Sequence, residues 1–248
     1  MLPHAARTEG RFDPPVLAAA ALRHTPCLRV PGFLPAQVAD DLHRELLDGV
    51  DYERVELADV TRQWRARRPL GDVYLGTMQR KPGWRTPPTV DAALAWFESD
   101  AFVTWLSRIA GEQLTFLRPV TAYRMQRGDR LCLHDDMSDP SHAVSIAYNL
   151  SREWQPGWGG QTRFGEVTAV TPLETPPDCP IPLQEWHVAN ESRFVPEFNS
   201  LLVIGLDQRY AHGVAEVTVD RPRLALVGIY GRLDQATAPS TTSEEKPS

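Results

Sequence analysis

The order of hydrophobic and polar positions predicts helices in the first half of the chain and strands in the second. Residues 35–49 place Val38, Leu42 and Leu46 at the spacing of an amphipathic helix, with a proline at the start and a glycine at the end. Residues 89–111 continue this pattern and predict one helix or two in sequence. A strand with a turn is predicted at 26–34, and a further strand at 50–58.

Beyond residue 111, strand patterns follow one another with no run of helical length between them. The predicted strands are 114–125, 130–134, 143–150, 161–169, 184–189, 200–205, 212–219 and 223–230. Helices followed by many short strands are typical of an α+β fold whose strands close into a sandwich or barrel.

Three segments show neither pattern. Residues 1–15 are predicted to be a loose leader, and 63–90, rich in Arg, Gly and Pro, a functional lid or a surface loop. Residues 233–248 are small and polar, which predicts a disordered tail. We therefore expect a single domain over 1–232, with the helices in residues 1–112 and a β core over 113–232.

Composition narrows the functional class. A chain of 248 residues is long enough for one large domain with a substantial core. The net charge of -6 argues against electrostatic binding to nucleic acid or to an anionic membrane, and no apolar run approaches the ~18–20 residues of a membrane span. Three widely spaced cysteines without a CxxC pair are typical of a reduced, cytoplasmic protein with no cysteine zinc site.

The stretch LCLHDD, residues 131–136, is a candidate half of a metal site. If it ends a strand, alternation places His134 and Asp136 on one face and turns Asp135 away. Asp136 would then be the ligand. The alternative is a solvated acidic turn with no metal.

The missing ligand should lie on another strand, and His212 in RYAHGVAEV is the candidate. Two imidazoles and one carboxylate make a facial triad that suits Fe(II) and leaves three coordination positions open. Zinc binds the same ligand types, so the triad alone does not name the metal. The alternative for His212 is a core histidine whose hydrogen bonds are satisfied within the protein.

Arg223 starts an apolar strand eleven residues after His212 and shares a face with Ala225 and Val227. An arginine leading into the interior needs an anionic partner, because an unpaired buried charge is costly. A bound dicarboxylate would supply one, gripped by the planar guanidinium. Arg221 has the same parity and is the reserve candidate. The alternative is a surface salt bridge.

These elements together resemble the iron- and 2-oxoglutarate-dependent dioxygenases of the prolyl-4-hydroxylase type. The resemblance covers roughly residues 115–232 and rests on four motifs in the family's order and spacing. They are HDD at 134–136, GGQTRF at 159–164, HGVAEV at 212–217 and RPRLALVGIY at 221–230.

The resemblance implies a double-stranded β-helix, a jelly-roll or cupin-like core, with the N-terminal helices packed on it. It implies that His134, Asp136 and His212 hold iron. It also implies that 2-oxoglutarate chelates the iron while its far carboxylate pairs with Arg223.

Three further positions match the family's co-substrate pocket. Tyr123 corresponds to a tyrosine about ten residues before the metal motif, and Thr162 lies in the strand across the pocket floor. Asn149 occupies a position where the family often carries a tyrosine that bonds the far carboxylate. This departure puts the detail of co-substrate binding in doubt.

The implied activity is hydroxylation of an unactivated C–H bond of an amino acid or peptidyl residue. O₂ is consumed, succinate and CO₂ are released, and a further requirement for ascorbate is left open. Because Asp136 is retained, the resemblance favours hydroxylation over halogenation. The substrate can be a small molecule, a peptide or a protein, and the sequence leaves the oligomeric state open.

Two alternatives remain at this stage. One is a non-catalytic protein on the same scaffold that binds a ligand or partner. The other is a metalloenzyme that does not use 2-oxoglutarate. The orientation of Arg223 relative to the metal distinguishes the 2-oxoglutarate enzyme from the second alternative, and turnover of 2-oxoglutarate without substrate distinguishes it from the first.

Overall fold

The computed structural model describes residues 12, 14–57, 61–66, 86–137, 139–174 and 184–233, and for 53–57 and 61–66 the backbone alone. The predictions for the leader 1–15, the loop 63–90 and the tail 233–248 therefore fall mostly outside the described residues. Cys179 also lies outside them.

The helices follow the hydrophobic pattern closely. The helix predicted at 35–49 is α1, Ala36–Asp48, and it buries Val38, Leu42 and Leu46. The segment 89–111 forms two helices, α2 at Pro88–Phe97 and α3 at Asp100–Ala110. Ser99 separates them and accepts a hydrogen bond from Phe102 N, which caps α3. Short 3₁₀ helices occur at Ala21–Arg23 (η2) and Pro156–Trp158 (η4). None of the helices in the described ranges is long and apolar enough to cross a membrane.

The strands are β1 Cys27–Pro31, β2 Tyr52–Leu57, β3 Thr61–Ala66, β4 Leu114–Phe116, β5 Thr121–Met125, β6 Leu131–His134, β7 His142–Asn149, β8 Thr162–Pro172, β9 Gln184–Phe194, β10 Ser200–Gly205, β11 Tyr210–Val214 and β12 Arg223–Arg232. Several differ from the sequence prediction, and β8 and β9 continue to Pro172 and Phe194, beyond their predicted ends at 169 and 189. The segment 114–125 holds two strands, β3 occupies the start of the predicted loop 63–90, and β11 begins and ends earlier than 212–219. Strand periodicity locates a strand well but fixes its ends poorly, because pairing with neighbours decides where it stops.

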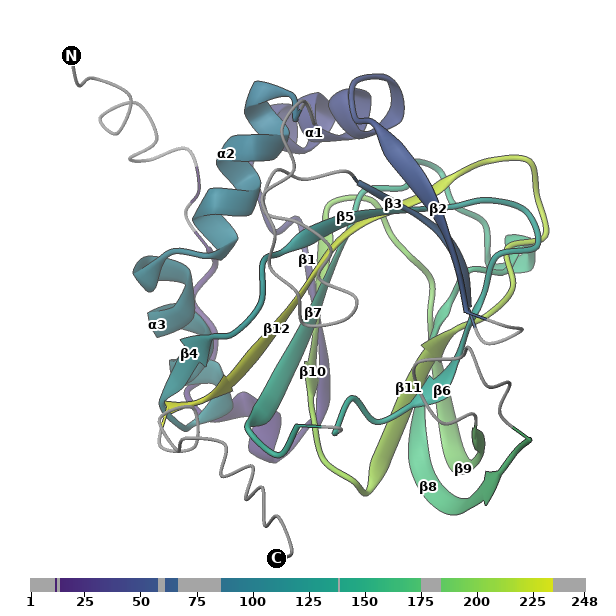
Figure 1. Ribbon diagram of the computed structural model, residues 1–248. Coiled ribbons are helices and arrows are strands. Elements are labelled where there is room, and N and C mark those ends of the chain that lie inside the picture. The colour runs from purple at the N-terminus through teal and green to yellow at the C-terminus, as the bar shows by residue number, and fades with distance from the viewer. Residues whose placement is uncertain are drawn as a thin grey trace, which may run out of the picture.

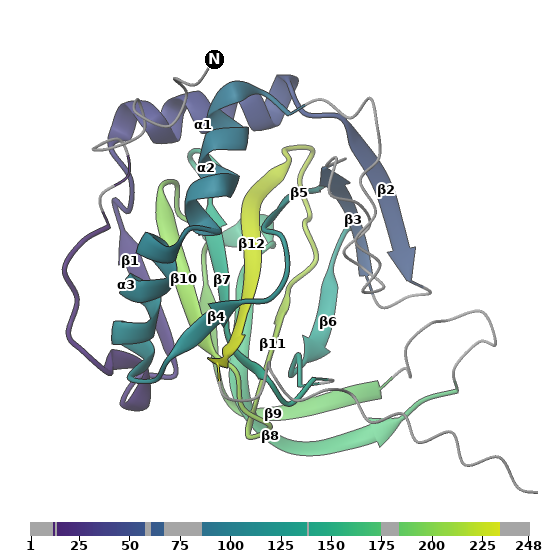
Figure 2. The ribbon, with the colours of Figure 1, turned by 60° about the vertical axis from the view of Figure 1, so that its left-hand side comes forward.

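The strands are hydrogen-bonded in the order β1-β10-β7-β12-β5-β3-β6-β11-β8-β9, with β2 on β3 and β4 on β12, and every pairing is antiparallel. Figure 1 shows the sheet folded into two walls that face each other, one containing β7, β10 and β12 and the other β6, β8 and β11. The helices cover the outside of the first wall (Figures 1 and 2). This is the α+β double-stranded β-helix implied by the resemblance.

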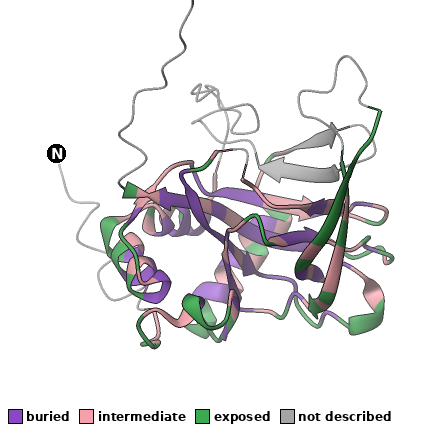
Figure 3. Cartoon of the chain, turned by 90° about the horizontal axis from the view of Figure 1, so that it is seen from below, coloured by how far each residue is buried: buried purple, intermediate pink, exposed green. Residues whose placement is uncertain are grey.

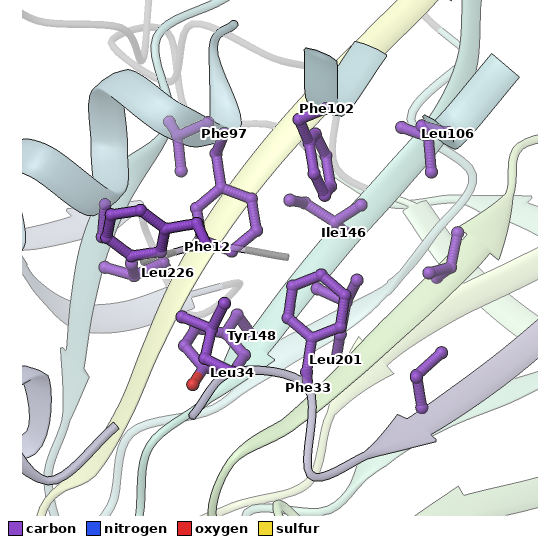
Figure 4. Close-up of a cluster of buried hydrophobic side chains, with 14 of the residues drawn as sticks. Phe12, Phe33, Leu34, Phe97, Phe102, Leu106, Ile146, Tyr148, Leu201 and Leu226 are labelled. Atoms are coloured by element: carbon purple, nitrogen blue, oxygen red, sulfur yellow. The ribbon is translucent and has the colours of Figure 1, made fainter. Parts of the chain in front are cut away.

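The first wall separates two environments. Leu201 and Val203 of β10 belong to the large apolar cluster that also holds the helices, whereas Leu202 and Ile204 belong to a smaller cluster on the barrel side. Phe97 and Phe102 are central to the larger cluster (Figure 4). Burial on both faces explains why β10 is continuously apolar. Viewed from below, buried residues concentrate in these strands and in the inward helix faces (Figure 3).

A side-chain carboxylate of α1 connects the helices α1 and α2. The Glu45 carboxylate, from α1, accepts hydrogen bonds from Thr89 N at 2.8 Å, Thr89 Oγ1 at 2.6 Å and Val90 N at 2.9 Å. The residue before α2, Pro87, has no side chain that can cap the helix. Glu45 therefore satisfies the free N–H groups at the start of α2 and places a negative charge at the positive end of its dipole.

We expect Glu45→Gln to lower the free energy of unfolding by about 1–2 kcal/mol, because it removes the charge and one acceptor. For a chain of this size, that is a loss of about 2–6 °C in the unfolding temperature, measured by calorimetry. Asp48→Asn, an exposed position on the same helix, is the matched control and should not destabilise the protein. Equal losses from the two variants would contradict the capping role.

Candidate functional site

The two candidate histidines are brought together by strand register. β11 pairs antiparallel with β6, and in this pairing His212 lies directly opposite His134. Directly opposite residues point to the same face of a sheet. The ring centroids are 4.5 Å apart, although 78 residues separate the two positions in the chain (212 − 134).

Asp136 reaches the same place by another route than the sequence analysis used. β6 ends at His134, so strand alternation does not extend to Asp136. Instead, Asp136 adopts a left-handed backbone with φ 57°, and this turn carries its side chain back to the histidines. The carboxylate of Asp135 accepts a hydrogen bond from Met137 N at 2.9 Å and thereby closes the turn. The expected pairing of His134 with Asp136 is present, but its physical reason was wrong.

The three side chains form a compact donor set, called here the His–Asp–His cluster (His134, Asp136 and His212). The Asp136 carboxylate lies 3.4 Å from His134 Nε2 through one oxygen and 3.2 Å from His212 Nε2 through the other. One ligand atom from each residue lies within 4.8 Å of the other two. Among the described residues, no other group of three such side chains has this geometry.

Hydrogen bonding and charge prepare the cluster for a cation. The main-chain carbonyl of Cys132 lies 2.8 Å from His134 Nδ1, so Nδ1 donates to it and Nε2 is the nitrogen that faces Asp136. Burial lowers the pKa of His134, but the charge and hydrogen bond of Asp136 outweigh it and raise that pKa, so a metal ion at Nε2 would displace a proton. Burial would raise the pKa of Asp136, but the charges and hydrogen bonds of the two histidines outweigh it and hold that pKa well below its usual range. Burial, followed by the neighbouring His134, lowers the pKa of His212. An ionised carboxylate and a neutral imidazole are the forms that bind metal.

Arg223 is a buried cation inside the barrel. The residue is 3% exposed, and its guanidinium contacts only neutral groups among the described residues: Asn149 Oδ1 and Thr162 Oγ1, both at 3.3 Å, and the Met125 sulfur at 3.7 Å. Its buried Nε has no hydrogen-bond partner within the same described ranges. Burial lowers the pKa of Arg223 to about 10, so it stays charged near neutrality. Such an arrangement favours an anionic ligand.

Of the other predicted pocket residues, Asn149 and Thr162 contact this guanidinium and Tyr123 lies on a neighbouring strand. Tyr123 of β5 and Asn149 of β7 both pair with Ala225 of β12, so the three lie in a row across the wall, next to Arg223. Thr162 approaches from the opposite wall, on β8. Asn149 uses its acceptor on Arg223, and its amide group lies at a long 3.4 Å from Ala147 O.

The register of β8 and β11 relates Arg223 to the cluster. His212 pairs with Phe164, and Val214 pairs with Thr162, the residue that contacts Arg223. Thr162 is therefore two residues along the wall from the level of His212, or roughly 7 Å. This separation is on the scale of a short dicarboxylate chain.

Three other arginines whose side chains the structure describes have partners, although Arg124 Nε, like Arg223 Nε, is buried without one among the described residues. Arg221 is exposed, 3.7 Å from Glu153, and stacks over Trp158. Arg163 makes a two-point contact with Glu191, and Arg124 donates to Leu47 O at the end of α1. Among the candidates for an anion partner, the structure thus distinguishes Arg223 from Arg221.

Sequence reasoning missed two contacts. It did not find that Asn149 accepts a hydrogen bond from Arg223, or that Met125 covers the same guanidinium. The pairing of β12 with β5 and β7 creates both contacts, and a signal for that pairing is absent from any one motif.

A family model described as the 2OG-Fe(II) oxygenase superfamily matches residues 120–231, a range that contains the cluster, Arg223 and the three pocket residues. No curated protein matches the chain.

Solved structures share the fold. A prolyl-4-hydroxylase from Pseudomonas putida has 19% identity and a TM-score of 0.57, with 87% of this chain and 97% of that chain covered. A prolyl hydroxylase from Trichoplax adhaerens, bound to a hypoxia inducible factor peptide fragment, has 16% identity and a TM-score of 0.59, covering 86% and 87%. The epimerase SnoN, bound to Fe³⁺, alpha ketoglutarate and nogalamycin RO, has 16% identity and a TM-score of 0.56, covering 92% and 91%.

At these identities the structural matches establish the fold, and the family model adds the motifs that run through the site. The match to the 2OG-Fe(II) oxygenase superfamily covers residues 120–231, the strand-rich region that carries the cluster on β6 and β11 and the buried arginine on β12.

Proposed function

We propose that this protein is an Fe(II)- and 2-oxoglutarate-dependent dioxygenase that hydroxylates an unactivated C–H bond of an amino acid or a peptidyl residue. The observation that carries the proposal is Arg223, a buried cation with no anionic partner among the described residues. It contacts Thr162, which lies two residues along β8 from the level of His212. Neither a zinc hydrolase nor a metal site without a co-substrate needs this charge.

The donor set of the cluster fits Fe(II). Two imidazole nitrogens and one carboxylate can hold one face of an octahedral ion and leave three positions free. In this role His134 and His212 bind through Nε2 and Asp136 through a carboxylate oxygen.

The second group, 2-oxoglutarate, fits the interior for a related reason. Its far carboxylate would give Arg223 the charge partner that the protein itself does not supply among the described residues. The neutral side chains of Asn149 and Thr162 hold the guanidinium without neutralising it. Tyr123, on the same face, would line the pocket.

When bound together, Fe(II), 2-oxoglutarate and O₂ supply the oxidising power to attack an unactivated C–H bond, with release of succinate and CO₂. The chain contributes position and exclusion of water. The cluster would hold the metal, and Arg223 would select a co-substrate of suitable length and set its orientation. Apolar residues of the barrel, such as Phe164 and Ile204, would keep water from the site.

The substrate class rests on similarity. Two of the structural neighbours are prolyl hydroxylases, and one of them is bound to a peptide. The epimerase SnoN shares the fold, so hydroxylation is one of the outcomes that the fold supports. We infer a small-molecule, peptide or protein substrate that presents an aliphatic amino-acid side chain.

The first prediction concerns turnover. The wild type, supplied with Fe(II), 2-oxoglutarate and O₂, should form succinate slowly without substrate and faster with a proline-containing peptide or free amino acid. Mass spectrometry should show the gain of one oxygen atom in that substrate. A product with unchanged mass and inverted stereochemistry would show that the reaction is epimerisation and not hydroxylation. No succinate under any condition, with Fe(II) bound, would favour a non-catalytic protein or a metalloenzyme without 2-oxoglutarate.

The second prediction separates the adjacent aspartates. Asp136→Asn should reduce succinate formation by about 100-fold or more, because the metal loses an anionic ligand. Asp135→Asn makes the same chemical change at the next position but keeps an oxygen that can accept from Met137 N, so it should remain near wild type. Succinate assays at saturating Fe(II) measure both. Similar losses from the two variants would contradict the assignment of Asp136.

The third prediction concerns the carboxylate anchor. Arg223→Leu should raise the apparent KM for 2-oxoglutarate by about 10- to 100-fold, the value of charge-assisted hydrogen bonds to a buried carboxylate. Arg221→Leu is the control and should change that KM little, because its side chain is exposed. A larger effect at Arg221 would overturn the anchor assignment.

A further inference from the structure

A third histidine contacts the candidate metal ligand Asp136, at its main chain and not at its carboxylate. His142, the first residue of β7, lies with its Nδ1 2.6 Å from the main-chain oxygen of Asp136. A carbonyl oxygen only accepts, so Nδ1 carries the proton and donates. His142 is 1% exposed, which leaves it no surface from which to touch a substrate.

The contact restrains a less common backbone conformation of Asp136. Its φ of 57° lies in the left-handed region, which few residues other than glycine adopt and which Asp adopts more readily than most. Without a restraint, the residue would relax toward negative φ and carry its carboxylate away from the two Nε2 atoms. Asp135 restrains the following peptide through Met137 N, and His142 restrains the carbonyl of Asp136 itself.

His142 is itself firmly held. Its N–H donates to Asp139 O at 3.1 Å, and its carbonyl accepts from Arg232 Nη1 at 2.7 Å. It also pairs with Gly231 across β7 and β12. The imidazole is therefore a fixed point between the first wall of the barrel and the turn that carries Asp136.

The other ring nitrogen of His142, Nε2, indicates that this histidine does more than stabilise the fold. Its Nε2 is buried and has no hydrogen-bond partner among the described residues. A buried polar atom without a hydrogen-bond partner is destabilising, and a leucine would fill the same space without that penalty. Violations of this kind occur in proteins mainly where function requires them.

We propose that His142 is a positioning residue for the metal: its Nδ1–H holds the carbonyl of Asp136 and thereby keeps the Asp136 carboxylate aligned with His134 and His212. The inference rests on the proposed metal role of Asp136. Groups that orient a metal ligand in this way typically contribute 10- to 100-fold to metal affinity.

The test is Co(II) binding to the metal-free protein, followed by the visible absorbance of the bound ion. His142→Leu should weaken binding by about 10- to 100-fold. His142→Asn places an amide N–H near the position of Nδ1 and should restore most of the affinity. His142→Gln carries its amide one bond further out and should behave like His142→Leu.

The chain offers a matched control in His43 on α1. Its Nδ1 also lies against a main-chain carbonyl, Leu150 O at 2.7 Å, but outside the barrel. His43→Leu should bind Co(II) as the wild type does. At saturating metal, His142→Leu should raise the KM for 2-oxoglutarate less than Arg223→Leu does, because the contact to the far carboxylate stays intact.

Two results would overturn the positioning role. One is wild-type Co(II) affinity in His142→Leu, and the other is equal weakening in the Leu and Asn variants, which would assign the effect to ring packing. If His142→Leu does not fold, the comparison of Asn with Gln decides between the same outcomes. Failure of the proposed function gives a different result: Co(II) binding that is absent in the wild type or unchanged in His212→Ala. That result removes the metal role of Asp136 and the positioning role with it.

Discussion

The antiparallel pairing of β6 with β11 is the constraint on which the rest of the site depends. It sets His134 directly opposite His212, while Asp136 reaches the pair through the turn that follows β6. The same strand β11 pairs with β8, which carries Thr162 to Arg223. A shift of one residue in either pairing would turn one partner to the opposite face. The positions of these side chains therefore depend on the backbone hydrogen bonds that pair β11 with β6 and with β8.

The two faces of the first wall have different roles. Its outer face holds the helices through a large apolar cluster, which includes Phe97 and Phe102, and this packing supplies most of the hydrophobic burial. Its inner face carries polar residues, Asn149 and Arg223, which contribute nothing comparable to stability. A buried arginine with a lowered pKa and only neutral partners is a cost. The helical layer stabilises a wall that carries this cost on its other side.

Much of the fold and the site could be predicted from the sequence, because local patterns carry both. Helical spacing located α1, and the order of the four motifs located His134, Asp136, His212 and Arg223. The reason given for Asp136 failed, since a four-residue strand ends before it and a left-handed turn replaces alternation. The contact of Asn149 with Arg223 and that of His142 with Asp136 depend on long-range pairing and turn geometry, which a single sequence does not encode in any short motif.

The central claim is that the cluster binds iron and that Arg223 binds the far end of a chelating 2-oxo acid in the same pocket. The most direct measurement is to titrate Fe(II) and 2-oxoglutarate into the metal-free protein without oxygen and to record the weak visible charge-transfer band of the chelate. The account predicts a band in the wild type that disappears in His212→Ala. Fe(II) binding without any band would contradict it, because the metal would then be present in a site that does not bring 2-oxoglutarate to it.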